Sequence, residues 1–225
     1  VYFYSPLIGF FPGNIYDEGL SPDWKLFQHQ LIVSAFSTII IFSILRFNKL
    51  ISKNKIVFTF TIIIAAAVFQ YFASDLGYNT TYTKLDRILY QKYYSRLFYL
   101  HYDEVSSDES RYITYNIMYY YRQLENILKV KPSKQIHIYL FNSRQQKKEL
   151  FGAGNADVAK PWQYSIYINA DSWEQTLKHE LVHIFSAEFG TGPFKLAAGL
   201  NPALIEGIAE AIESSVDNIS LFDFT

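Results

Sequence analysis

The longest uncharged stretch of this chain constrains its fold more than any other feature. Residues 26–45 contain no Asp, Glu, Lys or Arg. A helix of these 20 residues rises about 1.5 Å per residue and is roughly 30 Å long, the thickness of the hydrocarbon core of a bilayer. A second uncharged stretch, Ile56 to Ser74, is long enough to cross back. Neither stretch carries the polar stripe of a soluble helix, so we predict a two-helix transmembrane hairpin over residues 26–75 rather than two buried helices.

The charges that flank the two stretches predict their orientation. The connecting loop is basic and holds no acid, whereas residues 1–23 are acidic and hold no base. The positive-inside rule then places the hairpin loop in the cytoplasm, and puts the N-terminal segment (1–25) and all residues from 76 onward in the periplasm or outside the cell. The chain opens on Val1 and stops at Thr225 without an evident terminating element, and we expect it to be a fragment that continues at both ends. The orientation of the hairpin rests on four basic residues in the loop (Arg46, Lys49, Lys53 and Lys55) and on three acidic residues before the first helix (Asp17, Glu18 and Asp23).

The composition excludes several classes of function. The net charge is −1 and no long run of one sign occurs, so we expect no nucleic-acid partner. Gly152-Ala-Gly154 is not followed by Gly-Lys-Ser or Gly-Lys-Thr, so we expect no nucleotide. Without a single Cys, the strong metal ligands and bases available to the chain are His and carboxylates.

Residues 76–225 alternate between helical and strand-like patterns, which predicts an α+β domain with a small mixed sheet. Helical spacing favours helices over 82–94, from 106 to just before Pro132, and over 143–150. Aromatic and β-branched runs predict strands over 97–102, 135–141 and 164–169. His101 and His137 fall in two of these strands, and we interpret them as core or surface residues rather than ligands.

The most informative residues are His179-Glu-Leu-Val-His183. Asp171 supplies a helix start, and Leu177, Leu181 and Ile184 fall on one apolar face. Residues four apart on a helix project side by side, so His179 and His183 can share one metal ion, for which Zn²⁺ is the favoured candidate. Glu180 then points toward the open coordination position, where it can act as general base. The alternative is a chance match, but chance does not require a capped amphipathic helix around the motif.

A catalytic zinc needs a third protein ligand. Asn201 followed by Pro202 is a strong helix start, and the helix that it begins carries Glu206. Glu206, Glu210 and Glu213 share one helical face and would be an ordinary solvated stripe without the upstream motif. With that motif, we predict Glu206 as the third zinc ligand. Glu210 is a candidate for a hydrogen bond to a ligating His, or for a substitute ligand.

These two segments resemble the gluzincin metallopeptidases, a peptidase MA-like family in which a His-Glu-x-x-His helix is completed by a Glu, often within Glu-Gly-x-Ala. The matching residues are His179-Glu-Leu-Val-His183 and Ile205-Glu-Gly-Ile-Ala-Glu210, and a looser resemblance reaches back to about Leu97. The resemblance implies a zincin-like fold, one Zn²⁺ ion and a peptide or protein substrate. It also implies that an edge strand before the zinc helix binds extended substrate, and the strand in that place comprises Tyr164, Ser165, Ile166, Tyr167, Ile168 and Asn169.

Three functions are consistent with these features. The first is a membrane-anchored zinc metallopeptidase whose gluzincin-like domain, residues 76–225, lies outside the cytoplasm. The second is a membrane-tethered sensory or binding domain that holds the metal without turnover. The third is a transporter or channel subunit, which needs more spans than the two found here.

Overall fold

The structure is a computed structural model, and it describes residues 24–45, 53–104, 107–191 and 202–213. The expected segment 1–25 lies outside these residues except for its last two positions. The basic loop lies outside them from Arg46 to Ser52. The chain divides into two compact units, and most of the first is formed by its N-terminal helices.

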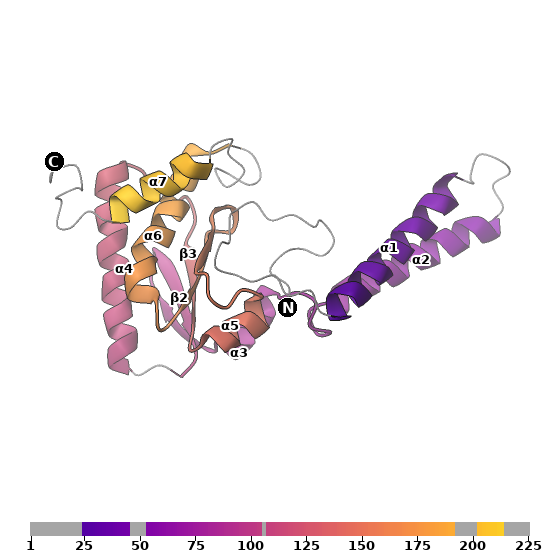
Figure 1. Ribbon diagram of the computed structural model, residues 1–225, viewed down its shortest axis with the longest axis horizontal. Helices are drawn as coiled ribbons and strands as arrows, with labels where there is room; N and C mark the ends of the chain where they lie inside the picture. Colours follow the sequence, from indigo (N-terminus) through magenta and orange to yellow (C-terminus); the bar gives the residue numbers. More distant parts are fainter. Residues whose placement is uncertain (1–23, 46–52, 105–106, 192–201, 214–225) are drawn as a thin grey trace. The chain divides into compact units, whose positions relative to one another are not determined.

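Helices α1 (Trp24–Leu45) and α2 (Lys53–Phe72) pack side by side (Figure 1). Phe36 and Phe69 meet between them, and the His29 ring is buried against Phe69 and Tyr78. Most of the remaining apolar side chains of both helices are exposed.

One helix in the described part of the chain, at Phe27–Leu45, is long and apolar enough to cross a membrane. The apolar part of α2, Ile56–Phe72, is shorter. Two spans were expected from the sequence, and the structure supports the first of them.

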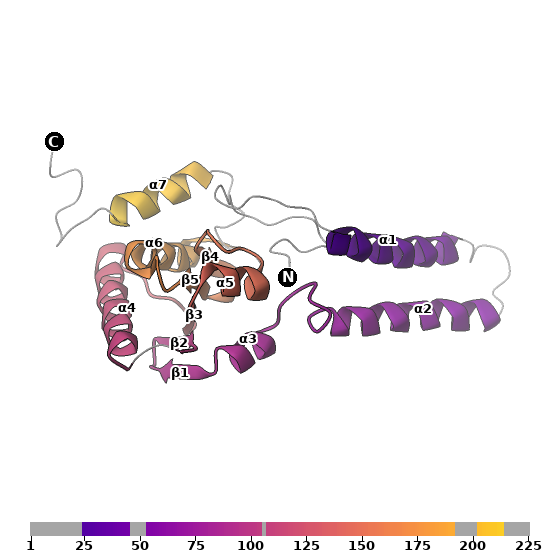
Figure 2. The same cartoon turned by 60° about the horizontal axis from the view of Figure 1, so that its bottom comes forward.

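The second unit is an α+β domain built on a mixed five-stranded sheet, as expected. The strand order is β1-β2-β3-β5-β4, with β2, β3 and β5 parallel and the two outer strands antiparallel to their neighbours (Figure 2). The strands are β1 (Gln91–Tyr94), β2 (Phe98–Tyr102), β3 (Ile136–Phe141), β4 (Val158–Lys160) and β5 (Ser165–Asn169).

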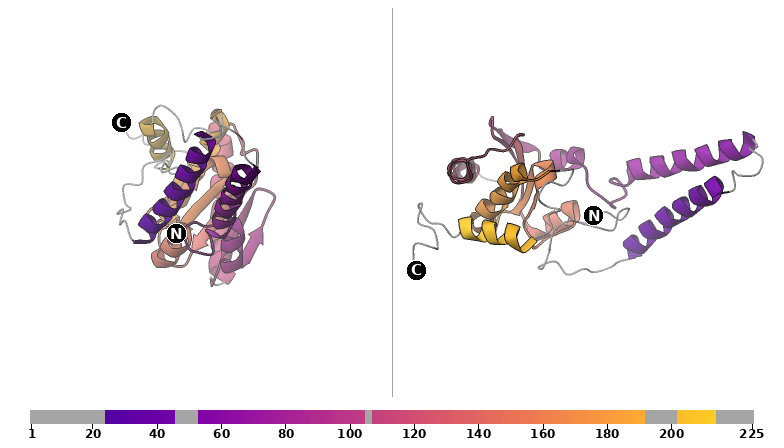
Figure 3. Two further views of the ribbon diagram at one scale, coloured as in Figure 1. Left: turned by 90° about the vertical axis from the view of Figure 1, so that its right-hand side faces the viewer. Right: turned by 90° about the horizontal axis from the view of Figure 1, so that it is seen from above.

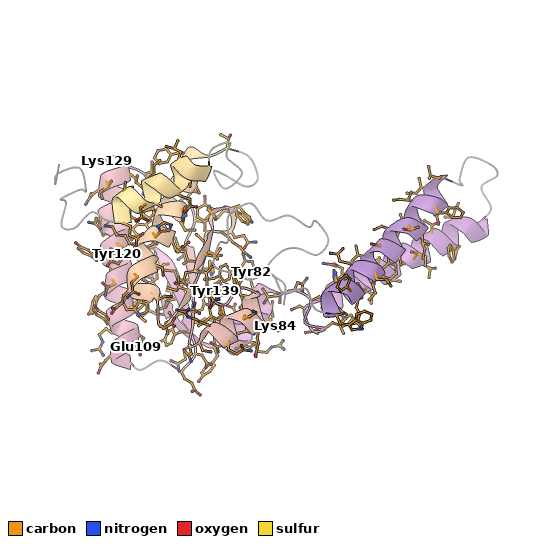
Figure 4. All side chains as sticks on the ribbon, viewed as in Figure 1. Tyr82, Lys84, Glu109, Tyr120, Lys129 and Tyr139 are labelled. Atoms are coloured by element: carbon orange, nitrogen blue, oxygen red, sulfur yellow. The ribbon has the colours of Figure 1, made fainter. Side chains whose placement is uncertain are left out.

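Helices α4 (Ser107–Leu128) and α6 (Trp173–Ser186) supply the core on one face of this sheet. Alternate strand residues point into that core, because successive side chains of a strand point to opposite faces. Two labels in Figure 4 locate these elements: Tyr120 lies on α4, and Tyr139 lies on β3. The remaining helices are α3 (Tyr82–Ile88), α5 (Arg144–Phe151) and α7 (Pro202–Glu213), with short 3₁₀ turns at Pro161–Gln163 and Ala187–Phe189.

The opposite face of the sheet carries a row of stacked rings. Tyr99 stacks on His137, His101 on Tyr139, and Tyr139 on Tyr167, with centroids 4.5–5.1 Å apart. His101 and His137 are therefore packing residues. Their ring nitrogens also meet, with His101 Nε2 3.1 Å from His137 Nδ1.

Two expectations about the elements are wrong. The helix expected over 82–94 ends at Ile88, and Gln91–Tyr94 forms a strand paired with β2. The aromatic run on both sides of Ser95 favours a β-hairpin, and the Ser95 hydroxyl accepts hydrogen bonds from the N–H groups of Leu97 and Phe98 within the turn.

The strand expected at the substrate edge is an interior strand. β5 pairs with β3 on one side and with β4 on the other, and all five of its residues are buried. The edge on this side of the sheet is β4, whose three residues are too few to show an alternating pattern in the sequence.

Candidate metal centre

Helix α6 presents two histidines one turn apart while its other side enters the core. Leu177, Leu181 and Ile184 are fully buried, because the 3.6-residue period brings them to the face that packs on the sheet. His179 and His183 lie away from that face and are partly exposed. The sequence therefore forms a helix whose register places both imidazoles together.

A carboxylate from α7 completes the group. His179 Nε2 lies 3.0 Å from His183 Nε2, and Glu206 Oε2 lies 3.4 Å and 3.5 Å from these two nitrogens. Donors bonded to one tetrahedral ion at about 2.0–2.1 Å are separated by roughly 3.3 Å. The three atoms are thus spaced as ligands of one metal ion are, and His179, His183 and Glu206 form a group that could hold one. Helices α6 and α7 pack against each other to bring this group together (Figure 3).

The charges of the group reinforce this arrangement. Hydrogen bonds with His179 and His183 hold the pKa of the Glu206 carboxyl well below its usual range. The pKa of His179 is raised to about 9, chiefly by its hydrogen bond with Glu206 and against the opposing effect of burial. Since a metal binds the deprotonated imidazole, an incoming cation competes with this proton and releases it.

A second carboxylate of α7 holds His179 from behind. Glu213 Oε2 lies 2.9 Å from His179 Nδ1, the ring nitrogen that faces away from Glu206. Such a contact fixes the orientation of a ligating imidazole and makes the nitrogen on its metal side more basic. Lys178 on α6 reaches the end of the same helix, where its Nζ donates to the Glu213 carbonyl at 3.3 Å.

Glu213 takes the role that the sequence suggested for Glu210. Glu210 is exposed, and it forms with His179 and Glu213 a second, overlapping group of possible donors. No hydrogen bond joins Glu210 to His179 or His183 among the described residues. In the sequence, Glu206, Glu210 and Glu213 share one helical face. This periodicity does not determine which of the carboxylates contacts the His179 imidazole.

The side chain of Glu180, a residue of α6, lies against the edge strand β4. Its side chain is 7% exposed, and its carboxylate accepts a hydrogen bond from the backbone N–H of Ala159 on β4. Burial raises the pKa of Glu180, and the nearby His183 and His179 act in the opposite direction. The expected general base is therefore a desolvated carboxyl beside both candidate ligands.

Asp157, just before β4, ties the supporting elements together. Its Oδ1 lies 2.6 Å from Lys147 Nζ in an ion pair that is buried on both sides. Asn169, at the end of β5, donates its backbone and side-chain N–H groups to the same oxygen. Ser172 and Thr176, at the start of α6, donate their hydroxyls to Oδ2. This network anchors the first turn of the helix that carries the two histidines.

The six residues of the expected substrate strand have structural roles instead. None of Tyr164 to Asn169 contributes an atom to the His179–His183–Glu206 group. Tyr164 precedes β5 in a left-handed conformation (φ 53°), and its hydroxyl donates to Glu188 at 2.7 Å. Asn169 belongs to the Asp157 network. The expectation placed the edge one strand too far along the chain.

Comparison with known proteins adds no relative to this picture. The candidate metal centre is therefore defined by the convergence of His179, His183 and Glu206 alone. No protein-family model, curated protein or solved structure matches the chain.

Proposed function

We propose that this protein is a membrane-anchored, zinc-dependent metallopeptidase of the gluzincin type. The single observation that carries the proposal is the convergence of His179 Nε2, His183 Nε2 and Glu206 Oε2. Two imidazoles and one carboxylate are a donor set typical of catalytic zinc, which keeps its fourth position for water or substrate. The general base expected by that chemistry, Glu180, follows the first histidine directly.

The residues of the site suit hydrolysis of a peptide bond. Zn²⁺ bound there would polarise the substrate carbonyl and lower the pKa of a water molecule toward about 7. Glu180 would accept the proton of the attacking water and pass it to the leaving amine, a role for which its raised pKa is suitable. Glu213 keeps the His179 ring turned toward the metal.

The position of β4 supports a peptide as the substrate. β4 ends the sheet beside the motif helix, and on the side away from β5 it pairs with no strand of the described residues. An extended peptide can add to such an edge through backbone hydrogen bonds. We therefore assign to Val158–Lys160 the binding of extended substrate that the resemblance implied for Tyr164–Asn169.

For the membrane part, the proposal is a hairpin of α1 and α2 with a cytoplasmic loop and an extracytoplasmic catalytic unit. The exposed apolar side chains of both helices support it. The basic residues between the helices support the orientation.

A second candidate is a tethered metal-binding domain without turnover. It is favoured by one observation, the buried Glu180 carboxylate that already accepts the Ala159 N–H. In that function the site would bind the ion as a sensor or a structural clasp.

Hydrolysis of a mixed peptide library by the full chain in detergent, with bound zinc measured in parallel, separates these candidates. We expect one zinc per chain in the wild type and in Glu180→Gln, and a loss of rate of about 10²-fold or more in that variant, the usual contribution of a general base. Glu206→Gln should lose both zinc and activity. An inert wild type with one zinc would overturn the peptidase and leave the binding domain, whereas a wild type without zinc would overturn both.

A further inference from the structure

The outer strand β1 and the turns on either side of it form an exposed surface of tyrosines and basic residues. Tyr90 and Tyr94 are 60% and 61% exposed, and Tyr93 is 41% exposed. A tyrosine side chain has an apolar ring and a polar hydroxyl, which suits an environment that is neither water nor core. We call this set the β1 surface, and it comprises Arg87, Tyr90, Lys92, Tyr93, Tyr94 and Arg96, all exposed.

The β1 surface itself carries three basic side chains, Arg87, Lys92 and Arg96, and no acidic one. Residues 87–102 contain three Lys or Arg and no Asp or Glu, and Asp86, Asp103 and Glu104 border this range. The acid just before them, Asp86, is already engaged by Lys92 at 3.4 Å and by His101 at 3.1 Å. Arg87 and Arg96 lie at the two ends of the surface, and no Asp or Glu lies between them in the sequence.

The strand geometry spreads these side chains around a sheet edge. Tyr94 lies opposite Tyr99 on the face of the stacked rings, and their rings are 4.7 Å apart. Tyr93 points to the other face, where it stacks on Phe98. On the side away from β2, β1 pairs with no strand of the described residues. The edge is thus lined with tyrosines on both faces.

The chain itself indicates what lies next to this surface. Helix α2 ends at Phe72 and α3 begins at Tyr82, so residues 73–81 connect the apolar helices to α3, which leads directly into β1. Nine residues extend at most about 30 Å. If the apolar helices enter a bilayer, the β1 surface is held near that bilayer at a high effective concentration.

We propose that the β1 surface binds the anionic phospholipid headgroups of the membrane that anchors the chain. Tyrosines are enriched at the membrane–water interface. Each Lys or Arg near an anionic membrane strengthens binding by about fivefold. The inference rests on the membrane anchor proposed above, and it adds a defined contact that orients the catalytic unit on the lipid surface.

The absence of cysteine allows a direct test with single labels on the full chain. Gln91→Cys on β1 and Asn126→Cys on α4 as a control would each carry a nitroxide label. The chain is reconstituted into nanodiscs of phosphatidylcholine alone or with about 30% phosphatidylglycerol, and label accessibility to a water-soluble relaxing agent is measured. The charge-reversed variant Arg87→Glu/Arg96→Glu, labelled at the same two positions, is the comparison.

We expect the label at 91 to become severalfold less accessible in the anionic discs, while the label at 126 stays unchanged. Reversal of the two arginines should return position 91 to its accessibility in neutral discs. Equal accessibility in both discs, in a chain that has inserted, overturns the β1 surface and leaves the anchor intact. Protection that needs an added protein rather than anionic lipid also overturns it. A chain that enters neither disc overturns the anchor, and this inference with it.

Discussion

Glu206 and Glu213 stand on one face of α7 and meet opposite nitrogens of the same imidazole. Glu206 lies 3.4 Å from Nε2 of His179, the nitrogen of the candidate metal centre, and Glu213 lies 2.9 Å from Nδ1. The ring is therefore held on both sides by carboxylates two helical turns apart. Glu210, between them in sequence, is exposed.

Replacement of Glu213 should weaken metal binding without removing a ligand. For Glu213→Gln we expect a loss of zinc affinity of about 10–100-fold, the usual effect of losing such a supporting carboxylate. Titration with a competing chelator measures it. Glu210→Gln, one turn away on the same helix, is the matched control and should bind zinc as the wild type does. Equal losses in both variants would mean that only the local negative charge matters.

The sequence was sufficient to predict that His179, His183 and Glu206 come together in a group that could hold a metal ion, but not which carboxylate contacts the other side of the His179 ring. His179, His183 and Glu206 follow from helical spacing and from the donor needs of a metal, which are local. The choice between Glu210 and Glu213 depends on the angle at which α7 crosses α6, and helical periodicity does not contain that angle. Glu180 was placed correctly on the motif helix, while its hydrogen bond from Ala159 required the position of β4.

At the scale of elements, the buried pair of Lys147 and Asp157 joins α5 to the start of α6. Both side chains are almost completely buried, and the oxygens of Asp157 also accept from Asn169, Ser172 and Thr176. A buried charge that is this well paired is tolerated, but a single unpaired partner is costly.

Asp157→Asn should therefore destabilise the α+β unit by about 3–5 kcal/mol, because it leaves the Lys147 ammonium buried without its counter-charge. Urea unfolding followed by the fluorescence of Trp162 and Trp173 measures the change. Asp171→Asn is the control: it breaks an exposed pair with Arg144 and should cost at most about 1 kcal/mol. Similar costs for the two variants would contradict the structural role of Asp157.

The stability of the same unit should fall in mild acid because of His101. Burial, the largest cause, lowers the pKa of His101 to about 4; Asp86 opposes it, and His137 and Lys92 reinforce it. Below pH 6.5 the unfolded chain binds a proton that the folded chain does not, so stability present above pH 6.5 is lost down to about pH 4. Between pH 7.5 and 5.0 we expect a loss of about 1–2 kcal/mol from this group. Urea unfolding of His101→Gln should show a smaller loss over that interval, and an unchanged pH dependence would exclude this residue as its source.

The sheet was predicted unevenly. β2, β3 and β5 were recognised because each is an apolar or aromatic run with turn residues around it. Both antiparallel outer strands were missed as strands. Gln91–Tyr94 continues a helical pattern from α3, and Val158–Lys160 is too short to show a pattern at all. Edge strands gain their structure from a neighbour, so their own residues carry little of the signal.

At the scale of the whole molecule, the proposed membrane attachment depends first on α1. Its segment Phe27–Leu45 has the length and composition of a span, and most of its side chains are exposed. The second crossing by α2 stays a prediction.

A charge in the middle of α1 should reduce membrane insertion. Ile39→Arg introduces a cost of about 2.5–3.5 kcal/mol for the span. We expect a smaller carbonate-resistant fraction of the full chain in isolated membranes, with Ile39→Leu as the control at wild-type level. Full insertion of the arginine variant would show that α1 does not lie in the hydrocarbon core.

The candidate ligands come from two helices, α6 and α7, that are separated in sequence by residues 187–201, so one ion would bridge two distant segments of the chain. Helix α7 buries Ala209 in the core, while Leu204 is exposed. An ion bound at the candidate site would add to the contacts that hold α7 on α6, since ligand binding to the folded form adds to its stability. Limited proteolysis with and without added zinc would register this as faster cleavage near α7 in the depleted protein. In a cell starved of the metal, quality-control proteases would remove the empty form first, and the abundance of the protein would follow the supply of its ion.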